Sequence, residues 1–308
     1  MTAPERAAAG PVLVLGASGF LGRRLSARLL AGGAEVTGVG RSPAPPAPGP
    51  GGSWSWIGAD TRETGPWQEA AERARLVVNL AGATIARRWT RRYKEEIHES
   101  RVATTRHVVE AIAPGSGTVL LNASATGWYG DRGEEELTEE SAPGEGLLAR
   151  ICRDWEAAAL AAAEKSARVV LMRFGVILGE GGALASMVPP FRFFLGGPLG
   201  RGRQWFPWIH IDDALAAAQR CSADPDLSGP VNFTAPEAVR QGDFARRLGR
   251  TLHRPALLPA PPFLLRLALG EFGRALLESQ RVRPARLEQA GFTFAHTRLA
   301  AALEDILA

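Results

Sequence analysis

Residues 12–22 read VLVLGASGFLG, and this stretch decides the fold. A short apolar run, typical of a buried strand, leads into glycines at positions 16, 19 and 22 and into a helix-like segment, residues 20–32. The first glycine permits a sharp turn, the second lets the backbone approach a bound diphosphate, and the third lets the helix pack closely on the strand. Free N–H groups and the helix dipole favour phosphate at such a helix start. The stretch therefore predicts a dinucleotide-binding strand, turn and helix, with an ordinary glycine turn as the less favoured alternative.

Apolar runs recur along the chain with helical patterns between them. The strand-like runs are residues 12–15, 35–39, 76–80, 118–122, 168–174 and 230–233, and the helical patterns are residues 20–32, 67–74, 91–113, 147–165 and 212–222. Strands that alternate with helices predict an α/β fold, a doubly wound (Rossmann) parallel sheet covered by helices on both faces.

The same patterns divide the chain into regions. We expect residues 1–10 to form a flexible tail and residues 11–178 to form the dinucleotide-binding domain, to which residues 206–234 return. Residues 179–205 are rich in glycine, proline and aromatic residues, and residues 235–308 are mainly helical. These last two segments are expected to form a smaller substrate region or lid. A stretch after the second strand, PAPPAPGPGG, is expected to be a surface loop.

The composition is that of a globular enzyme. The chain has 308 residues, of which 45% are apolar and 22% are charged. No apolar run is long enough to span a bilayer, and the apolar residues near the N-terminus fit a first strand better than a signal peptide. Cys152 and Cys221 form neither a CxxC motif nor a disulfide framework, which fits a reducing compartment. We therefore expect a cytoplasmic protein without a membrane partner.

The charge is basic and comes almost entirely from arginine. The formal net charge is +4 and the isoelectric point is about 9.6, while the only lysines are Lys94 and Lys165. Because the guanidinium fork binds phosphate and carboxylate, a phosphorylated or anionic ligand is plausible. Residues 87–94, RRWTRRYK, resemble a nucleic-acid patch with interleaved aromatic residues. Three glutamates follow within five residues and favour a solvated helix start, so no nucleic-acid partner is expected.

The end of the second strand decides between the two nicotinamide cofactors. An acid there binds the ribose 2′-OH of NAD, whereas an arginine accepts the 2′-phosphate of NADP. Residues 35–40, EVTGVG, are followed by Arg41 and Ser42, and no acid occurs until Asp60. This arrangement favours NADP, although Arg41 facing solvent is the alternative. Asp60 is expected either beneath the adenine or in a turn.

Long motifs carry a family resemblance through nearly the whole chain. They are GASGFLG (16–22), NLAG (79–82), SRVATT (100–105), NASATGWYG (122–130), CRDWE (152–156), RFGVILG (173–179), GGPLGRGRQWFPWIHIDD (196–213) and ALLESQRVRPARLEQAGF (275–292). Together they resemble the extended short-chain dehydrogenase/reductase superfamily and, within it, an atypical subgroup called epimerase family proteins, which carries a C-terminal domain of unknown function.

The resemblance implies NADP as cofactor and a small-molecule substrate, with an anionic substrate left open. Relatives often pair through helices, which leaves a homodimer open. The cofactor contacts expected from the pattern and the resemblance together are Gly16, Ser18, Gly19, Phe20, Leu21, Gly22, Gly40, Arg41, Ser42, Leu80, Ala81, Gly82, Arg101 and Arg173. Arg173 is also expected to line the substrate side. Arg201 and Arg203, on a glycine-rich loop, are expected either to grip an anion or to lie in solvent.

The chain departs from the family at its chemistry. Such enzymes rely on a tyrosine and a lysine four residues apart on one helix, which places both side chains on the same face. Here Tyr93 is followed four residues later by Ile97, and Tyr129 by Gly133. Alignment with the family helix puts Leu148 and Cys152 at the positions of the tyrosine and the lysine. The usual dyad is absent.

Four other residues are candidates for catalysis. Ser124 and Thr126 flank the position of the family hydroxyl, although Ser124 equally fits a strand end. Tyr129 is a weak general-acid candidate. Cys152 would be reactive as a thiolate but also fits a buried core position.

His210 with its two following aspartates suggests a metal, but an aspartate N-cap of the next helix is the better interpretation, and no metal is expected. The chain is therefore interpreted as an NADP-dependent oxidoreductase or epimerase-like enzyme with a rebuilt proton-transfer group. The alternative is a non-catalytic NADP(H)-binding sensor or regulatory protein.

Overall fold

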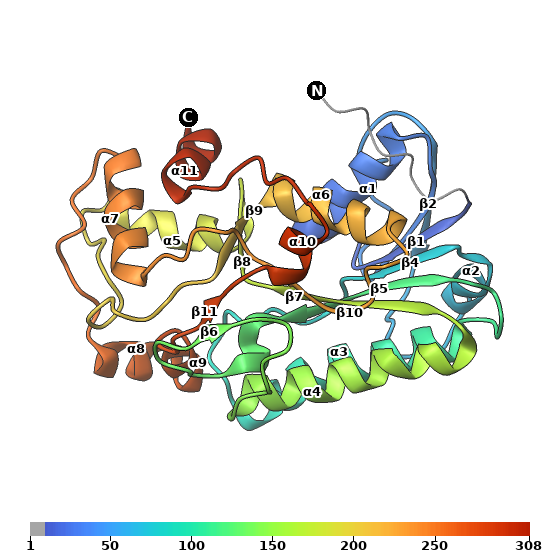
Figure 1. Cartoon of the computed structure of the whole chain (residues 1–308), viewed down its shortest axis with the longest axis horizontal. Helices are drawn as coiled ribbons and strands as arrows, with labels where there is room; N and C mark the ends of the chain where they lie inside the picture. Colours follow the sequence, from blue (N-terminus) through green and yellow to red (C-terminus); the bar gives the residue numbers. More distant parts are fainter. Residues whose placement is uncertain (1–9) are drawn as a thin grey trace.

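The computed structural model describes residues 10–308, so the tail expected at residues 1–10 lies, apart from its last residue, outside the described part. Its centre is a parallel sheet of seven strands in the order β10-β7-β5-β4-β1-β2-β3 (Figure 1). The strands are β1 (Val12–Leu15), β2 (Glu35–Gly40), β3 (Ser53–Gly58), β4 (Leu76–Asn79), β5 (Val119–Ala125), β7 (Arg168–Phe174) and β10 (Gly229–Phe233). After β1 the chain adds β2 and β3 on one side of that strand. It then crosses to β4 on the other side of β1, so the strand order reverses between β1 and β4. The predicted doubly wound α/β fold is confirmed.

Helices cover both faces of the sheet, and Figure 1 shows α1 and α6 on one side and α3 and α4 on the other. The bounds are α1 (Phe20–Ala31), α2 (Trp67–Arg73), α3 (Arg91–Ala111), α4 (Leu147–Leu160) and α6 (Ile211–Ala223). Each face of the sheet has its own hydrophobic core, and alternate side chains of β1 point into one or the other. Val12 and Val14 pack with α1 and α6, whereas Leu13 and Leu15 pack with α2 and α3. The apolar run that begins the chain is thus a strand buried on both faces.

The remaining elements lie outside the main sheet, and some of them share a separate core. They are β6 (Glu136–Leu137), β8 (Val176–Leu178), α5 (Gly182–Arg192), β9 (Trp208–His210), α7 (Gln241–Thr251), α8 (Pro262–Leu269), α9 (Glu271–Ala275), β11 (Arg281–Val282), α10 (Ala285–Gln289) and α11 (Leu299–Leu307), with short 3₁₀ turns η1 (Thr126–Tyr129) and η2 (Ala161–Lys165). Leu184 of α5, Phe244 of α7 and Leu303 of α11 share one buried cluster. Strand β9 pairs with β8 outside the main sheet, although it falls in the segment assigned to the sheet domain.

One strand of the sheet is absent from the sequence prediction. β3 pairs along its whole length with β2 at the sheet edge. Side chains at Gly38 and Gly40 would collide with the indoles of Trp54 and Trp56, where a Cβ would lie 2.3 Å and 2.8 Å from ring carbons. The two glycines of β2 thus make room for the tryptophans of β3, which pack over them.

Candidate cofactor site

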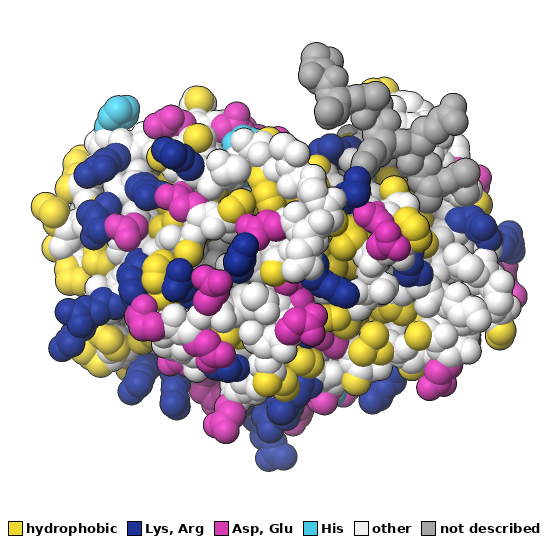
Figure 2. All heavy atoms as spheres, in the orientation of Figure 1, with side chains coloured by type: hydrophobic (Ala, Val, Ile, Leu, Met, Phe, Trp, Pro, Cys, Tyr) yellow, Lys and Arg dark blue, Asp and Glu magenta, His cyan; other side chains and the backbone are white. Residues whose placement is uncertain are grey.

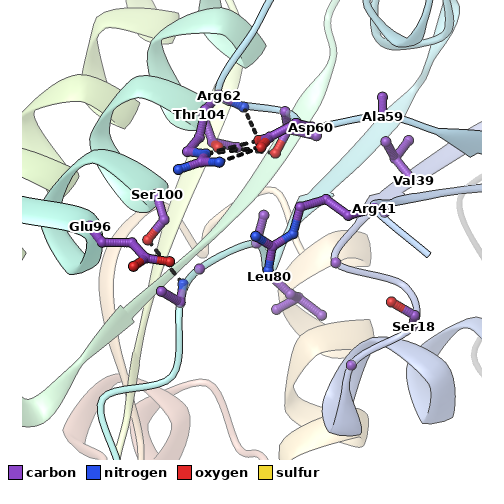
Figure 3. A pocket seen from close by; sticks show the side chains of 17 residues that line it. Ser18, Val39, Arg41, Ala59, Asp60, Arg62, Leu80, Glu96, Ser100 and Thr104 are labelled. Atoms are coloured by element: carbon purple, nitrogen blue, oxygen red, sulfur yellow. Dashed lines mark hydrogen bonds and ion pairs between the residues drawn. The ribbon is translucent and has the colours of Figure 1, made fainter. Parts of the chain in front are cut away.

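A pocket of about 250 Å³ opens at the carboxyl edge of the sheet, where the strand order reverses. It is bounded by the ends of β1, β2, β3 and β4 and by one face of α3 (Figure 3). The lining residues are Gly16, Ser18, Gly19, Val39, Gly40, Arg41, Ala59, Asp60, Thr61, Arg62, Leu80, Ala81, Gly82, Ala83, Glu96, Ser100 and Thr104. A crevice outside the carboxyl ends of parallel strands, at the reversal of strand order, is where this class of fold binds nucleotides.

The glycine bend at the mouth of the pocket has no room for side chains. Gly16 has a φ of +75°, and a Cβ there would lie 2.9 Å from the carbonyl oxygen of Leu80. A Cβ on Gly22 would lie 2.3 Å from the carbonyl oxygen of Gly16. Helix α1 begins after Gly19 without a side-chain cap, so its first N–H groups are available to a ligand. The bend therefore fits a diphosphate held by backbone N–H groups.

Three of the four charged side chains that line the pocket follow strands β2 and β3. Arg62 donates to both carboxylate oxygens of Asp60, with its Nη2 2.5 Å from Oδ2. The hydrogen bond from Arg62 keeps the pKa of the Asp60 carboxyl below its usual value. Arg41 points into the pocket from the end of β2, and no ion pair to it occurs within residues 10–308. Arg62 thus neutralises Asp60, which leaves Arg41 available for an anion.

Eight of the predicted cofactor residues line this pocket. They are Gly16, Ser18, Gly19, Gly40, Arg41, Leu80, Ala81 and Gly82. Gly22 shapes the bend from behind, while Phe20 and Leu21 pack against the core beneath α1. Ser42 lies just outside, and its carbonyl oxygen accepts a hydrogen bond from Trp56 at 3.3 Å.

Several lining residues were missed by the sequence prediction. Glu96, Ser100 and Thr104 line the pocket from α3, and their spacing of four places them on one helix face. Ser100 Oγ accepts a hydrogen bond from the backbone N–H of Ala83 at 2.9 Å, which fixes the loop after β4 against α3 (Figure 3). The regular spacing was the signal that could have identified this face.

Arg173 does not line the pocket, so the structure does not support its expected contact with the cofactor, and its expected place on the substrate side stays a prediction. Its side chain is 3% exposed and donates through Nε and Nη2 to the two carboxylate oxygens of Glu156, at 2.9 Å and 2.8 Å. Its Nη1 donates to the hydroxyl of Tyr129 at 3.1 Å and to the carbonyl of Glu139 at 3.3 Å. These bonds use four of the five N–H donors of a guanidinium that is buried in the core.

The four catalytic candidates are buried in the same region. Ser124 donates to Glu156 at 2.6 Å, and Thr126 is 5% exposed. Tyr129 is fully buried, its hydroxyl donates to Asn232 at 2.7 Å, and burial raises its pKa to about 12. Burial likewise raises the pKa of the Cys152 thiol to about 12, so it stays protonated at neutral pH. None of the four lines the pocket.

Leu148 and Cys152, which the resemblance aligns with the missing dyad, both lie on α4. A Cβ on Gly127 would lie 3.2 Å from Leu148 Cβ and 3.8 Å from Cys152 Sγ, so this face of α4 packs against the turn after β5. The thiol of Cys152 donates to the carbonyl of Ala125 at 3.8 Å. The two α4 positions that the resemblance assigns to the dyad hold an apolar side chain and a thiol.

His210 differs from its predicted role. It is itself the N-cap of α6, because its Nδ1 accepts the backbone N–H of Asp212 at 3.2 Å, and the predicted aspartate cap is wrong. His296 stacks on its ring at 3.7 Å, and ligand atoms of His210, His296 and Asp305 lie within 4.8 Å of one another. Since Nδ1 accepts a hydrogen bond, the neutral ring carries its proton on Nε2, the atom nearest Asp305. A metal would need that nitrogen deprotonated, so the N-cap role of Nδ1 argues against a metal here.

This cluster yields a pH prediction. Burial and the charge of His296 lower the pKa of His210, while Asp212, Asp213 and Asp305 favour its charged form. A folded-state pKa below the unfolded value of about 6.5 means that the unfolded chain takes up the proton first, so this contribution to stability is present above that pH and lost below it. We expect the free energy of unfolding to fall more between pH 7.5 and 5.5 in the wild type than in His210→Asn, which keeps a good N-cap. Urea titrations at the two pH values test this, and equal losses would contradict it.

The basic cluster at the start of α3 is partly offset by acids. Arg91 pairs with Glu95 at 3.5 Å, and Lys94 pairs with Glu271 of α9 at 2.8 Å. Figure 2 shows acidic and basic side chains intermingled over the face in view. Arg201 and Arg203 do not line the pocket. The absence of a nucleic-acid partner stays a prediction.

The parallel sheet, its reversal point and the side-chain-free bend define a nucleotide-binding protein of the doubly wound class. Residues 12–232 match the NAD dependent epimerase/dehydratase family and residues 260–306 match a domain of unknown function, DUF1731. The chain belongs to the NAD dependent epimerase/dehydratase family, which confirms the resemblance seen in the sequence.

Relatives extend over nearly the whole chain. The epimerase family protein SDR39U1 homolog of Arabidopsis thaliana, described as chloroplastic, is 41% identical over 96% of this chain and 86% of its own length. The epimerase family protein Mb2239 of Mycobacterium bovis is 39% identical over 95% of this chain and 96% of its own length. The crystal structure of human epimerase family protein SDR39U1 with NADPH matches with a TM-score of 0.85 and 33% identity, over 96% of this chain and 99% of that one. Within residues 10–308, no helix is both long and apolar enough to cross a membrane.

Proposed function

We propose that this protein is an NADP(H)-dependent oxidoreductase or epimerase-like enzyme. The observation that carries the proposal is Arg41, which points into the pocket from the end of β2, while the nearest acid, Asp60, is already paired with Arg62. A cation at that strand end suits the 2′-phosphate that distinguishes NADP from NAD. The human relative whose structure contains NADPH supports the same cofactor.

The residues fit this cofactor as follows. The bend at Gly16 and Gly19 would hold the diphosphate, Arg41 the 2′-phosphate, and the small residues after β4 would leave room for the nicotinamide half. When bound, NADPH supplies a hydride. The chain's own part is to orient that half against the loop that Ser100 fixes to α3.

The cofactor preference rests on Arg41. We expect Arg41→Ala to weaken NADPH binding about 10- to 100-fold, because a charge-assisted hydrogen bond contributes about 1.5–3 kcal/mol, and to leave NADH binding nearly unchanged. Isothermal titration calorimetry with both nucleotides measures this. Arg73→Ala serves as the control, since Arg73 lies on α2 outside the pocket and pairs with Glu69. Equal losses for NADPH and NADH would refute the 2′-phosphate role.

A second function, a non-catalytic NADP(H) sensor, is favoured by one observation. Ser124, Thr126, Tyr129 and Cys152 are all buried, and none of them lines the cofactor pocket. Loss of general acid catalysis typically costs about 10²–10⁴-fold in rate. Absorbance screening of NADPH oxidation against carbonyl compounds and sugar nucleotides separates the two functions, because a sensor binds NADPH tightly and oxidises none of them.

A further inference from the structure

Large apolar side chains are exposed together at one end of the molecule, on three segments of the chain. Among the described residues, all but one of the exposed large apolar side chains belong to this group, the exception being Leu160 of α4. The group, which we name the apolar face, consists of Phe193, Phe194, Leu195, Leu257, Leu258, Phe263, Leu264 and Leu267. Soluble proteins rarely expose so many large apolar side chains in one place without a partner, so this face is a candidate interaction surface.

The three segments lie side by side, so the apolar face is one surface. The backbone N–H of Leu258 donates to the carbonyl oxygen of Gly196 at 3.2 Å, and Ala260 pairs with Leu199. Helix α8 follows directly after Pro261, and none of its residues is buried. Figures 1 and 2 show α8 and the segments beside it at the left of the molecule, where yellow and dark-blue side chains lie next to one another.

The charges around the apolar face are basic. Residues 181–211 and 244–270, which carry the face, contain eight arginines and no acidic residue. Arg192, Arg254 and Arg266 are exposed, and none of the three forms an ion pair within residues 10–308. The face therefore combines apolar side chains with cations that are available to an anionic partner.

A second copy of the chain fits this surface poorly. In a symmetric dimer the same face meets itself, so its arginines would approach one another. Asp243 and Glu271, the acids that flank residues 244–270, are already paired with Arg246 and Lys94 and supply no opposite charge.

The shape of the face favours a lipid bilayer over another protein. Phe193, Leu257 and Leu267 are 73%, 80% and 70% exposed, so they project into solvent and do not line a groove. Protein interfaces owe most of their affinity to anchor side chains that fill pockets, whereas the boundary between lipid head groups and acyl chains accepts projecting side chains of any shape. The guanidinium of Arg254 lies 4.9 Å from the centroid of the Phe194 ring, so a cation stands beside the apolar side chains, at the depth where lipid phosphates lie.

We propose that the apolar face rests on a membrane surface that contains anionic phospholipids. Its leucine and phenylalanine side chains enter the boundary between head groups and acyl chains, and the surrounding arginines bind lipid phosphates. A protein that lies on a bilayer needs no spanning segment, so the lack of a long apolar run, from which the sequence predicted no membrane partner, does not bear on such contact. The inference is independent of the cofactor, since no residue of the apolar face lines its pocket.

Flotation with lipid vesicles tests the apolar contribution. Wild-type protein should bind vesicles of phosphatidylcholine and phosphatidylglycerol, mixed about two to one, at least about tenfold more tightly than phosphatidylcholine alone. The triple variant Phe193→Gln, Leu257→Gln, Leu267→Gln should bind the mixed vesicles at least about 100-fold more weakly, because three apolar side chains no longer enter the bilayer. Leu160→Gln, an exposed leucine outside the face, is the matched control and should bind as the wild type does. Wild-type protein that stays unbound, or a triple variant that binds equally well, overturns the proposal.

A second pair of variants tests the charges. Arg254→Gln combined with Arg266→Gln should weaken binding to the mixed vesicles about 10- to 30-fold, and high salt should weaken the binding of wild type in the same direction. Arg28→Gln, an exposed position on α1, is the control. Unchanged affinity in the double variant would show that anionic lipid is not what these arginines bind.

A dye on the face locates the contact. Cys152 and Cys221 are both buried, so a cysteine introduced at an exposed position reacts selectively with an environment-sensitive dye. On addition of mixed vesicles, emission from the dye at Leu267→Cys should shift to the blue and resist quenching by iodide, whereas the dye at Leu160→Cys should not respond. A dye at Leu267→Cys that stays exposed to water contradicts the proposal. A blue shift that needs no vesicles and grows with protein concentration would overturn it in favour of a second copy of the chain.

Discussion

Replacing Glu156 by alanine is expected to lower the free energy of unfolding by about 3–5 kcal/mol, because the change leaves a buried arginine unpaired. The side chains of Glu156 and Arg173 are each 3% exposed and share two hydrogen bonds. Burial alone would lower the pKa of Arg173, but the hydrogen bonds that it donates to Glu156, together with the charge of Glu156, raise it. Ser124 would lose its acceptor in the same variant. Urea denaturation followed by circular dichroism measures the loss.

Two further variants separate the ion pair from simple packing. Glu164→Ala removes an exposed glutamate just after α4 and should change stability little. The double variant Glu156→Met with Arg173→Met removes both charges and is expected to lose much less than Glu156→Ala, since no uncompensated charge stays in the core. If Glu156→Ala unfolds within about 1 kcal/mol of the wild type, the pair does not have the structural role assigned to it.

The residues that the sequence could locate are those held by local chain geometry. The bend at Gly16 and Gly19, Arg41 after β2 and the loop after β4 each directly follow an apolar run, and all of them line the pocket. Parallel strands that end at one sheet edge bring such positions together whatever the details of packing. Local pattern was therefore sufficient for this half of the site.

The roles of the buried polar residues depend on contacts between segments that are far apart in the sequence. Arg173 is 17 residues from Glu156, and Tyr129 is 103 residues from Asn232, so no local pattern shows that these groups satisfy one another in the core. The same limit applies to His296, which reaches His210 only because the C-terminal segment folds back over α6. A buried arginine and a ligand-binding arginine have the same sequence signature, and only the partner distinguishes them.

Strand β3 was missed for a different reason. Its sequence, SWSWIG, alternates polar and aromatic residues as an edge strand does, but a proline- and glycine-rich loop precedes it. The rings of Trp54 and Trp56 are placed by Gly38 and Gly40 on β2, which have no side chains to oppose them. The sequence signal for β3 was therefore the pairing of its two tryptophans with the two glycines of β2, which is visible only when both strands are considered together.

Gly16→Ala is expected to weaken NADPH binding at least about tenfold, with a folded protein retained. Alanine at a φ of +75° costs about 1–2 kcal/mol in backbone strain. Its Cβ would also lie 2.9 Å from the carbonyl oxygen of Leu80 and 3.1 Å from the backbone nitrogen of Ala81, and neither is a flexible side chain that can move away. The chain must therefore shift at the bend or at the loop after β4, and both line the pocket.

Gly33 offers a matched control for the backbone strain. Its φ is +82°, it follows α1 at the opposite end from the bend, and a Cβ there would meet nothing within 4 Å. The backbone strain of a left-handed alanine should lower the free energy of unfolding of Gly33→Ala by about 1–2 kcal/mol, as it does in Gly16→Ala. Gly33→Ala should nevertheless bind NADPH with the affinity of the wild type. Calorimetry and thermal unfolding of the two variants then separate the strain of a left-handed alanine from displacement of the phosphate-binding backbone. Wild-type NADPH affinity in Gly16→Ala would mean that the diphosphate is held elsewhere, since a bend moved by even a few tenths of an ångström cannot keep every backbone hydrogen bond to it.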